Sequence, residues 1–162
     1  MDIILLSKFA LFGGLSEDQI DNIIPLMAEE EYNKDDIIIK EGKTNDKVYF
    51  IISGQVSVTK RDTFLYNYSE GDHFGEMEVL DVIPADATIK AVTPVNVITI
   101  SNKALRAIYN IDVKTFSVIT MNLTRDLSRR MRRLGEQYAA IKQAAFGGVK
   151  NACSGLVHDA AV

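Results

Sequence analysis

The chain has 162 residues, a net charge of −4 and a sequence pI of about 5.2, and 47% of its residues are hydrophobic against 25% charged. This is the balance of one globular domain with its own core, and the acidic charge argues against duplex DNA as the main partner. The single cysteine, Cys153, excludes an intrachain disulfide or a cysteine metal site, so we expect a reducing, cytoplasmic compartment.

Residues 1–27 carry helical signals. The apolar run Ile3–Leu6 is too short to cross a membrane and has no basic leader, so we expect no membrane segment here. Ser16 and Gln19 have the spacing of a capping box, which predicts that a helix begins at this point. Pro25 predicts a kink or an early end of that helix. The apolar face of the helix is predicted to contain Ile20, Ile23, Ile24 and Met27.

From Tyr32 onward the hydrophobic pattern takes the period of strands. Turn residues such as Glu41-Gly42, Ser53-Gly54 and Thr93-Pro94 separate the predicted strands. Short strands with turns about every eight to ten residues are typical of an antiparallel sheet. We therefore predict a mainly β (α+β) fold, an antiparallel β-roll or jelly roll (a double-stranded β-helix) of about eight strands. The expected strands lie at residues 36–40, 48–52, 55–59, 64–68, 87–92 and 95–100.

Helices are predicted to follow the strands. Ser101 can cap a short helix that turns Leu105 and Ile108 inward, and a long helix is expected over about residues 113–145. Apolar residues recur along the long helix at alternating spacings of four and three, which is the pattern of a coiled-coil seam. This seam predicts a homodimer through the long helix. Its residues are Leu127, Met131, Leu134, Tyr138 and Ile141.

Five arginines lie beside this seam, and a sequence rich in Gly and Ala comes after it. We interpret the arginines as charges that keep the seam soluble and set its pairing; the alternative is a patch for phosphate, nucleic acid or a partner protein. Residues 146–162 are expected to be weakly helical or disordered, so the domain is predicted to occupy residues 1–145. The arginines are Arg125, Arg129, Arg130, Arg132 and Arg133.

The most informative stretch is residues 71–89. It opens with Gly71-Asp72, continues through Phe74-Gly75-Glu76 and a short apolar run, and closes on Pro84–Thr88. A glycine lets backbone N–H groups approach a ligand, and a helix that begins there adds free donors and a positive dipole end. The stretch therefore has the pattern of an anion cradle.

With three other segments in the same order and spacing, this stretch resembles the cyclic-nucleotide-binding domain family, the sensor domain of catabolite-activator-type regulators. The other segments are Leu11–Ser16, Glu41-Gly42 and Tyr49–Gly54, and the resemblance extends over about residues 5–145. It implies a ligand pocket, and the position of Glu76 implies a contact with the sugar of a cyclic nucleotide. The implied pocket residues are Phe74, Gly75, Glu76, Met77, Ala85, Asp86, Ala87 and Thr88.

One departure from the family pattern bears on function. The family places an arginine that pairs with the cyclic phosphate where this chain has Ala85, and Asp86 follows. A hydrogen bond to a charged group contributes about 1.5–3 kcal/mol, so we expect cyclic AMP and cyclic GMP to bind weakly or not at all. In the family, the start of the long helix meets the adenine end of the ligand, and Arg125 or Arg129 could replace the missing cation. The candidate helix residues are Thr124, Arg125, Ser128 and Arg129.

We find no pattern for catalysis or for a metal. His73 stands beside acidic residues, but the spacing matches no metal motif and predicts a surface or loop histidine. The acidic residues have no nucleophile–base arrangement, so we expect a solvated rim, and no Walker, Rossmann or hydrolase motif is present. The chain is therefore not predicted to be an enzyme. The acidic residues are Glu76, Glu78, Asp81 and Asp86.

Three functions follow from these observations. In the first, the chain is a regulatory module with weak or lost cyclic nucleotide binding, and its output passes through a homodimer or an unknown protein partner. In the second, it is a working sensor for a cyclic nucleotide or another small anion. In the third, it is the effector domain of a transcription regulator, and residues 146–162 are too few for a DNA-binding part, so we expect no specific DNA binding.

Overall fold

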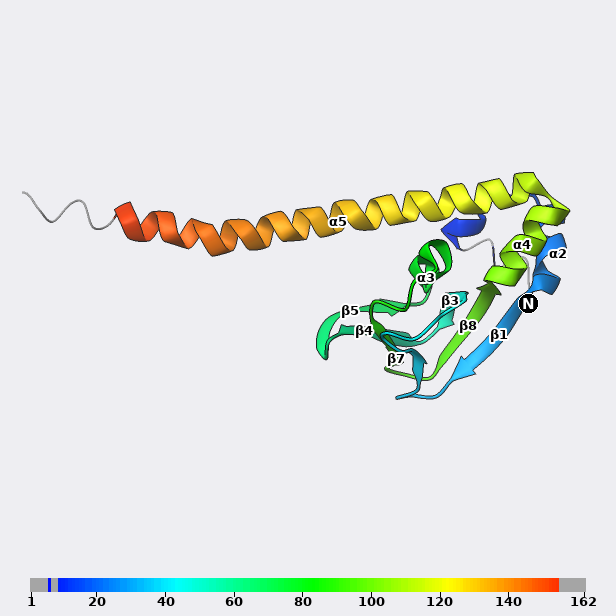
Figure 1. Cartoon of the computed structure of the whole chain (residues 1–162), viewed down its shortest axis with the longest axis horizontal. Coiled ribbons are helices and arrows are strands. Elements are labelled where there is room, and N and C mark those ends of the chain that lie inside the picture. Colours follow the sequence, from blue (N-terminus) through cyan, green and yellow to red (C-terminus); the bar gives the residue numbers. More distant parts are fainter. Residues whose placement is uncertain (1–5, 7–8, 155–162) are drawn as a thin grey trace, which may run out of the picture. The chain divides into compact units, whose positions relative to one another are not determined.

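In the computed structural model, which describes Leu6 and residues 9–154 (residues 146–154 by their backbone alone), eight strands form two antiparallel sheets. One sheet has the strand order β1-β8-β3-β6 and the other β2-β7-β4-β5 (Figure 1). The predicted mainly β roll with accompanying helices is confirmed. The strands are β1 (Met27–Tyr32), β2 (Ile37–Ile39), β3 (Lys47–Ser53), β4 (Gln55–Lys60), β5 (Thr63–Ser69), β6 (His73–Phe74), β7 (Thr88–Ala91) and β8 (Val95–Ser101).

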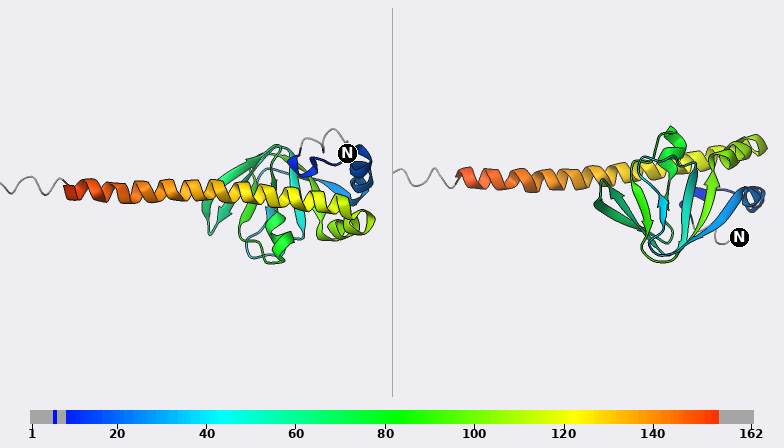
Figure 2. Two further views of the ribbon diagram at one scale, coloured as in Figure 1. Left: turned by 90° about the horizontal axis from the view of Figure 1, so that it is seen from above. Right: turned by 60° about the horizontal axis from the view of Figure 1, so that its bottom comes forward.

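The helices stand before, within and after the strands, and the chain divides into two compact units after Leu123. The first unit contains both sheets, and Figure 2 shows their strands curving around a common interior. The second unit is the continuation of α5. The helices are η1 (Ala10–Phe12), α2 (Glu17–Ile23), η2 (Ile24–Leu26), α3 (Glu76–Asp81), α4 (Asn102–Ile111) and α5 (Val113–Ser154).

The start of the fold confirms one predicted feature and corrects another. The Ser16 hydroxyl accepts a hydrogen bond from the Gln19 N–H (3.3 Å), and the Gln19 side chain accepts one from the Ser16 N–H (3.0 Å), which is the predicted capping box. The expectation that Met27 lies on the same helix is wrong. After α2 and η2 the chain becomes strand β1, whose residues pair with β8 from Met27↔Ile100 to Tyr32↔Val95.

Strand β3 lies between two hydrophobic clusters because its successive side chains point to opposite faces. Val48 and Phe50 belong to the cluster under the helices, which also includes Ile119 and Leu123 of α5. The other face of β3 contributes to the cluster inside the roll. The main members of that interior cluster are Ile39, Tyr49, Ile51, Val56, Phe74, Ala85, Ile89 and Val97. The interior cluster therefore joins β4, β6 and β7, which contribute Val56, Phe74 and Ile89 to it.

Asp112 caps the N-terminus of α5. Its carboxylate accepts hydrogen bonds from the Thr115 hydroxyl (2.5 Å), from the N–H of Lys114 (3.0 Å) and from the side-chain amide of Gln19 (3.1 Å). The Thr115 hydroxyl is the largest cause, and the amide of Gln19 the next, of a pKa of about 2 for Asp112. The first turn of α5 is thus joined to α2, 93 residues earlier in the sequence.

In the second unit, α5 continues to Ser154, beyond the predicted end near residue 145. The remainder of the predicted tail, residues 155–162, and the apolar residues 3–5 lie outside the described part of the chain. Four of the predicted seam residues have exposed fractions between 57% and 73%, and the fifth, Leu127, is half-buried. The exposed four are Met131, Leu134, Tyr138 and Ile141. Across the described residues, no helix is both long enough and apolar enough to cross a membrane.

Candidate functional site

A cavity of about 110 Å³ lies where β4, β5, β6 and β7 meet α3. This volume is small, because small-molecule sites usually have about 300–1,000 Å³. Leu65, Tyr66 and Met77 line the cavity while remaining about half exposed, so they form its mouth. The complete lining is Ile39, Val58, Lys60, Leu65, Tyr66, Tyr68, Phe74, Gly75, Glu76, Met77, Glu78, Asp86, Ala87 and Ile89.

Aromatic rings form the inner wall of the cavity. Phe74 stacks on Tyr49 at a centroid distance of 4.9 Å and lies nearly parallel to Tyr68 at 6.3 Å. The register Tyr49↔Phe74 between β3 and β6 fixes the first of these pairs. Burial raises the pKa of Tyr49 to about 12, so its phenol stays protonated under ordinary conditions. The wall offers flat apolar faces suited to a ring-shaped ligand.

Gly75 has a structural reason to be glycine. Its φ is +83°, and a Cβ there would lie 2.5 Å from the carbonyl oxygen of Lys47. The side-chain amide of Asn45 donates to the carbonyl oxygens of Lys47 (2.8 Å) and Gly75 (3.3 Å), which holds the start of α3 against β3. The glycine that indicated a ligand cradle in the sequence is thus also required by the packing of the fold.

Positions 85 and 86 have different environments. Ala85 is buried in the interior cluster and does not line the cavity. Its N–H donates to the carbonyl oxygen of Lys43 (2.8 Å), and its own carbonyl accepts from the N–H of Gly42 (2.8 Å). Asp86 does line the cavity, and its two carboxylate oxygens accept hydrogen bonds of 2.7 and 2.6 Å from the ammonium group of Lys60. Lys60 was not predicted, although its alternation with Val58 along β4 could have indicated it.

The other acidic residues and the histidine correct two predictions. Glu76 and Glu78 are only 2% and 9% exposed and line the cavity, so they are not part of a solvated rim; Asp81 and Asp86 are exposed. The prediction of a surface or loop position for His73 is also wrong, because it lies buried in β6 with its ring 5.8 Å from that of Phe50. Within the described residues, no three His, Cys, Asp or Glu side chains are grouped as metal ligands.

The structure brings six of the eight predicted pocket residues together. Phe74, Gly75, Glu76, Met77, Asp86 and Ala87 line the cavity. Ala85 and Thr88 do not; the Thr88 hydroxyl instead accepts a hydrogen bond from the N–H of Glu41 (3.1 Å), which ties β7 to the end of β2. The four helix candidates, residues 124, 125, 128 and 129, belong to the second unit, and their contribution to ligand binding remains a prediction.

The sequence model of the cyclic nucleotide-binding domain matches residues 29–112, that is, 84 of the 162 residues. This chain therefore belongs to the cyclic nucleotide-binding domain family, as its resemblance predicted.

Two curated relatives give the range of proteins that carry such a domain. A cAMP-dependent protein kinase regulatory subunit from Debaryomyces hansenii is 34% identical over 96 residues, which cover 59% of this chain and 21% of that protein. A CRP-like cAMP-activated global transcriptional regulator from Mycobacterium tuberculosis is 25% identical over 140 residues, which cover 83% of this chain and 61% of that protein. The matches thus cover about a fifth of the kinase subunit and about three fifths of the regulator.

The regulatory subunit of a cAMP-independent protein kinase A from Trypanosoma brucei has a similar fold. Its structure matches 76% of this chain with a TM-score of 0.66 and 23% identity, and the match covers 43% of that subunit. A mutant of the same subunit with three substitutions is bound to cAMP in its A site; it also has a TM-score of 0.66, with 22% identity, and 45% of it is covered. At this identity the likeness shows the fold alone.

Proposed function

We propose that this chain is a regulatory, non-enzymatic module in which high affinity for cyclic nucleotides is lost and whose output passes through pairing of α5. The observation that carries the proposal is the pair of residues at positions 85 and 86. Ala85 offers no cation and is buried, while Asp86 adds a carboxylate to the lining of the cavity. A phosphate would lack the arginine that the family places at position 85 and would meet the carboxylate of Asp86, and both effects lower its affinity.

The size of the cavity supports the same proposal. About 110 Å³ is below the usual range for a bound small molecule, and the side chains of Leu65, Tyr66 and Met77 occupy its mouth. A ligand the size of a nucleotide would have to displace these side chains. We infer that the output depends less on a tightly held ligand than on the exposed seam of α5, which fits a second copy of this chain or a partner helix.

A second candidate is a working sensor for a small ligand, and the cavity itself favours it. Phe74, Gly75 and Glu76 still form one wall, and the carboxylate of Glu76 can accept hydrogen bonds from ligand hydroxyl groups. The mycobacterial relative, a cAMP-activated transcriptional regulator, supports a related candidate, the effector domain of such a regulator.

Binding measurements on the wild-type protein separate the first two candidates. Thermal shift and calorimetry with cyclic AMP and cyclic GMP should show little or no binding. A ligand that did bind, at about 100 times its Kd, would add about 2.7 kcal/mol to the free energy of unfolding, which thermal shift would detect. Submicromolar binding by the wild type would overturn the proposal and support the sensor.

Restoring the missing charge provides the positive test. The variant Ala85→Arg, Asp86→Ala, Glu78→Ala adds a cation and removes two cavity carboxylates, so cyclic AMP affinity should rise by about a hundredfold, the effect of two charge-assisted hydrogen bonds. The cAMP-bound trypanosome mutant supports this design. It carries a Glu-to-Ala change and, seven positions later, adjacent Thr-to-Arg and Val-to-Ala changes. Glu78, Ala85 and Asp86 have the same spacing in this chain.

A fourth substitution tests whether the gained binding uses the cavity. Glu76→Ala, added to the triple variant, should weaken cyclic AMP again by removing an acceptor for ligand hydroxyls. Each variant must keep the circular dichroism spectrum and cooperative unfolding of the wild type, because Ala85→Arg places a large charged side chain at a buried position. A folded triple variant that does not bind would indicate that the cavity cannot open.

A further inference from the structure

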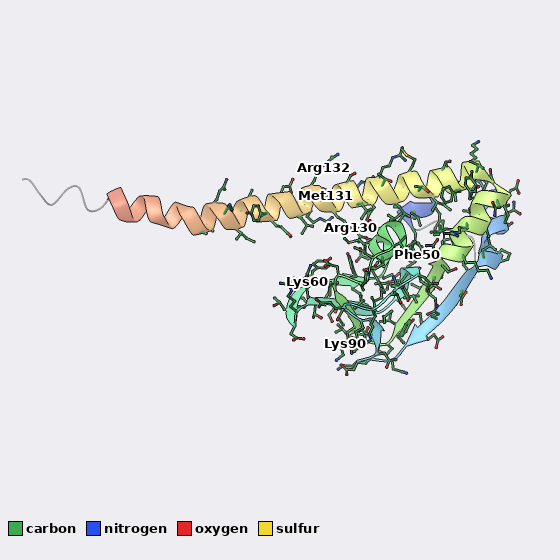
Figure 3. All side chains as sticks on the ribbon, in the orientation of Figure 1. Phe50, Lys60, Lys90, Arg130, Met131 and Arg132 are labelled. Carbon is green, nitrogen blue, oxygen red and sulfur yellow. The ribbon has the colours of Figure 1, made fainter. Side chains whose placement is uncertain are left out.

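Lys60 is held at the edge of the cavity by the strand that carries it. Val56 and Val58 lie on the same face of β4 and are buried inside the roll, so the alternation of the strand turns Lys60 toward the same interior. The residues at 61 and 62 both have positive φ (49° and 60°), which makes a two-residue hairpin turn and pairs Lys60 with Thr63. Figure 3 labels Lys60 where β4 ends in this hairpin.

Asp86 reaches the ammonium group of Lys60 from the bend just before the neighbouring strand, β7 (Thr88–Ala91). The register of β4 and β7 pairs Thr59 with Thr88, so the residue after Thr59 and the residues before Thr88 lie at the same end of the sheet. Both carboxylate oxygens of Asp86 accept hydrogen bonds from the Lys60 ammonium group, at 2.7 and 2.6 Å. The two side chains are 37% and 58% exposed, so the pair stands at the opening of the cavity and not in its depth.

We propose that Lys60 is the cation of this pocket and that Asp86 is an internal counter-ion that keeps anionic ligands out. The inference deepens the proposed function and rests on it. Among the lining residues, the carboxylates of Glu76, Glu78 and Asp86 stand against the single ammonium of Lys60. An anion must therefore displace the Asp86 carboxylate and then lie beside it, whereas an uncharged ligand competes for neither charge. The Lys60–Asp86 pair thus sets which ligand charge the pocket accepts.

The substitution Asp86→Asn tests this inference because it keeps the size of the side chain and removes its charge. Two probes are used, cyclic AMP as the anion and adenosine as an uncharged molecule with the same base and a ribose. Affinity for cyclic AMP should rise by about tenfold or more in Asp86→Asn, as expected for one charge-assisted hydrogen bond, while affinity for adenosine should change by less than about twofold. The gain should shrink at high salt, because it comes from a partly exposed charge.

The double variant Lys60→Gln, Asp86→Asn identifies the source of the gain. If Lys60 is the cation, the double variant should lose the gain and return to the cyclic AMP affinity of the wild type. If the double variant keeps the gain, Lys60 is not the cation and the inference is wrong. The inference is also overturned if Asp86→Asn binds cyclic AMP no more tightly than the wild type does, including the case in which neither binds measurably.

The chain contains a matched control pair outside the cavity. Lys90 and Asp35 form an ion pair of 2.6 Å with exposed fractions of 44% and 65%, and neither residue lines the cavity. Lys90 is labelled in Figure 3 away from Lys60. Asp35→Asn makes the same change in net charge, so it should leave both affinities unchanged; a gain equal to that of Asp86→Asn would show an effect of net charge and refute the inference.

These results remain distinct from those that test the proposed function. Tight binding of cyclic AMP by the wild type would overturn the proposed loss of affinity. Even then, a change in the ratio of cyclic AMP to adenosine affinity in Asp86→Asn would support the role of the Lys60–Asp86 pair. Weak binding by the wild type with no effect of Asp86→Asn would leave the proposed function intact and overturn the role of the Lys60–Asp86 pair.

Discussion

At the scale of single residues, Val82 has an unusual backbone. It ends α3 in the left-handed conformation, with φ 56° and ψ 37°, and its N–H donates to the carbonyl oxygen of Glu78 (2.9 Å). A β-branched residue is strained in this conformation by about 1–2 kcal/mol. Its side chain is 80% exposed, so its packing contacts offset little of this strain energy. The strain lies at the end of the helix that carries Glu76, Met77 and Glu78 to the cavity.

We predict that Val82→Gly stabilises the protein. Glycine removes the strain but adds about 0.5–1 kcal/mol of backbone entropy to the unfolded state, so the free energy of unfolding should rise by about 0.5–1 kcal/mol. Urea unfolding measures this change. The control is Val113→Gly, the same substitution at an exposed valine in the first turn of α5, which should destabilise. Equal effects of both substitutions would contradict the strain at Val82.

At the scale of elements, the N-terminus of α5 depends on Asp112. The carboxylate caps the helix and also receives the amide of Gln19, so one side chain joins two helices of the first unit. Its hydrogen bonds require the ionised form, which is why they hold the pKa of Asp112 at about 2, below the ordinary value of 3.8. A cap of this kind links the stability of the fold to pH.

The direction of that linkage follows from the lowered pKa. The stabilisation by Asp112 is fully present above about pH 3.8 and should be lost as the pH falls through about 2, because the unfolded state binds the proton first. Asp112→Asn keeps a capping oxygen without the titration. The stability difference between wild type and variant, from urea unfolding at about pH 5 and below, should therefore shrink toward pH 2. A difference that does not change with pH would refute this role.

At the scale of the whole molecule, the exposed seam of α5 indicates assembly. Met131, Leu134, Tyr138 and Ile141 repeat at coiled-coil spacing and are largely exposed in the single chain. Asp126 and Arg130 form an i,i+4 ion pair of 2.6 Å beside them, as is common on the flanks of a helix. Large exposed apolar side chains that repeat in this way are typical of a surface that a partner covers.

We predict a homodimer through this seam. Light scattering at micromolar concentration should give twice 18.0 kDa. Leu134→Asp should shift the mass to that of a monomer, because it places charges in the apolar seam. Gln143→Asp is the control, since it adds the same charge outside the a and d positions and should leave the dimer intact. A wild-type mass of 18.0 kDa at every concentration would exclude the homodimer and favour a partner of another kind.

The sequence by itself determined those features that depend on neighbours along the chain. The capping box at Ser16, the alternation along β3 and β4, the early end of the helix at Pro25 and the spacing of the α5 seam all come from interactions within a few residues. The order of the motifs around Phe74–Glu76 determined the family and the position of the cavity wall. These signals depend only on the residues and their order along the chain, so they can be recognised before the fold is known.

Only the tertiary structure decided which distant residues meet. Strand β1 has three consecutive glutamates and little strand character, and it forms because β8 provides a partner for each of its residues. The register of β4 with β7 brings Lys60 close to Asp86, 26 residues away, and backbone hydrogen bonds with Gly42 and Lys43 hold Ala85 in the interior cluster. A one-residue slip of β4 in that register would turn the side chain of Lys60 to the other face of the sheet. The meeting of Lys60 with Asp86 therefore follows from strand pairing, which the alternation along β4 does not specify by itself.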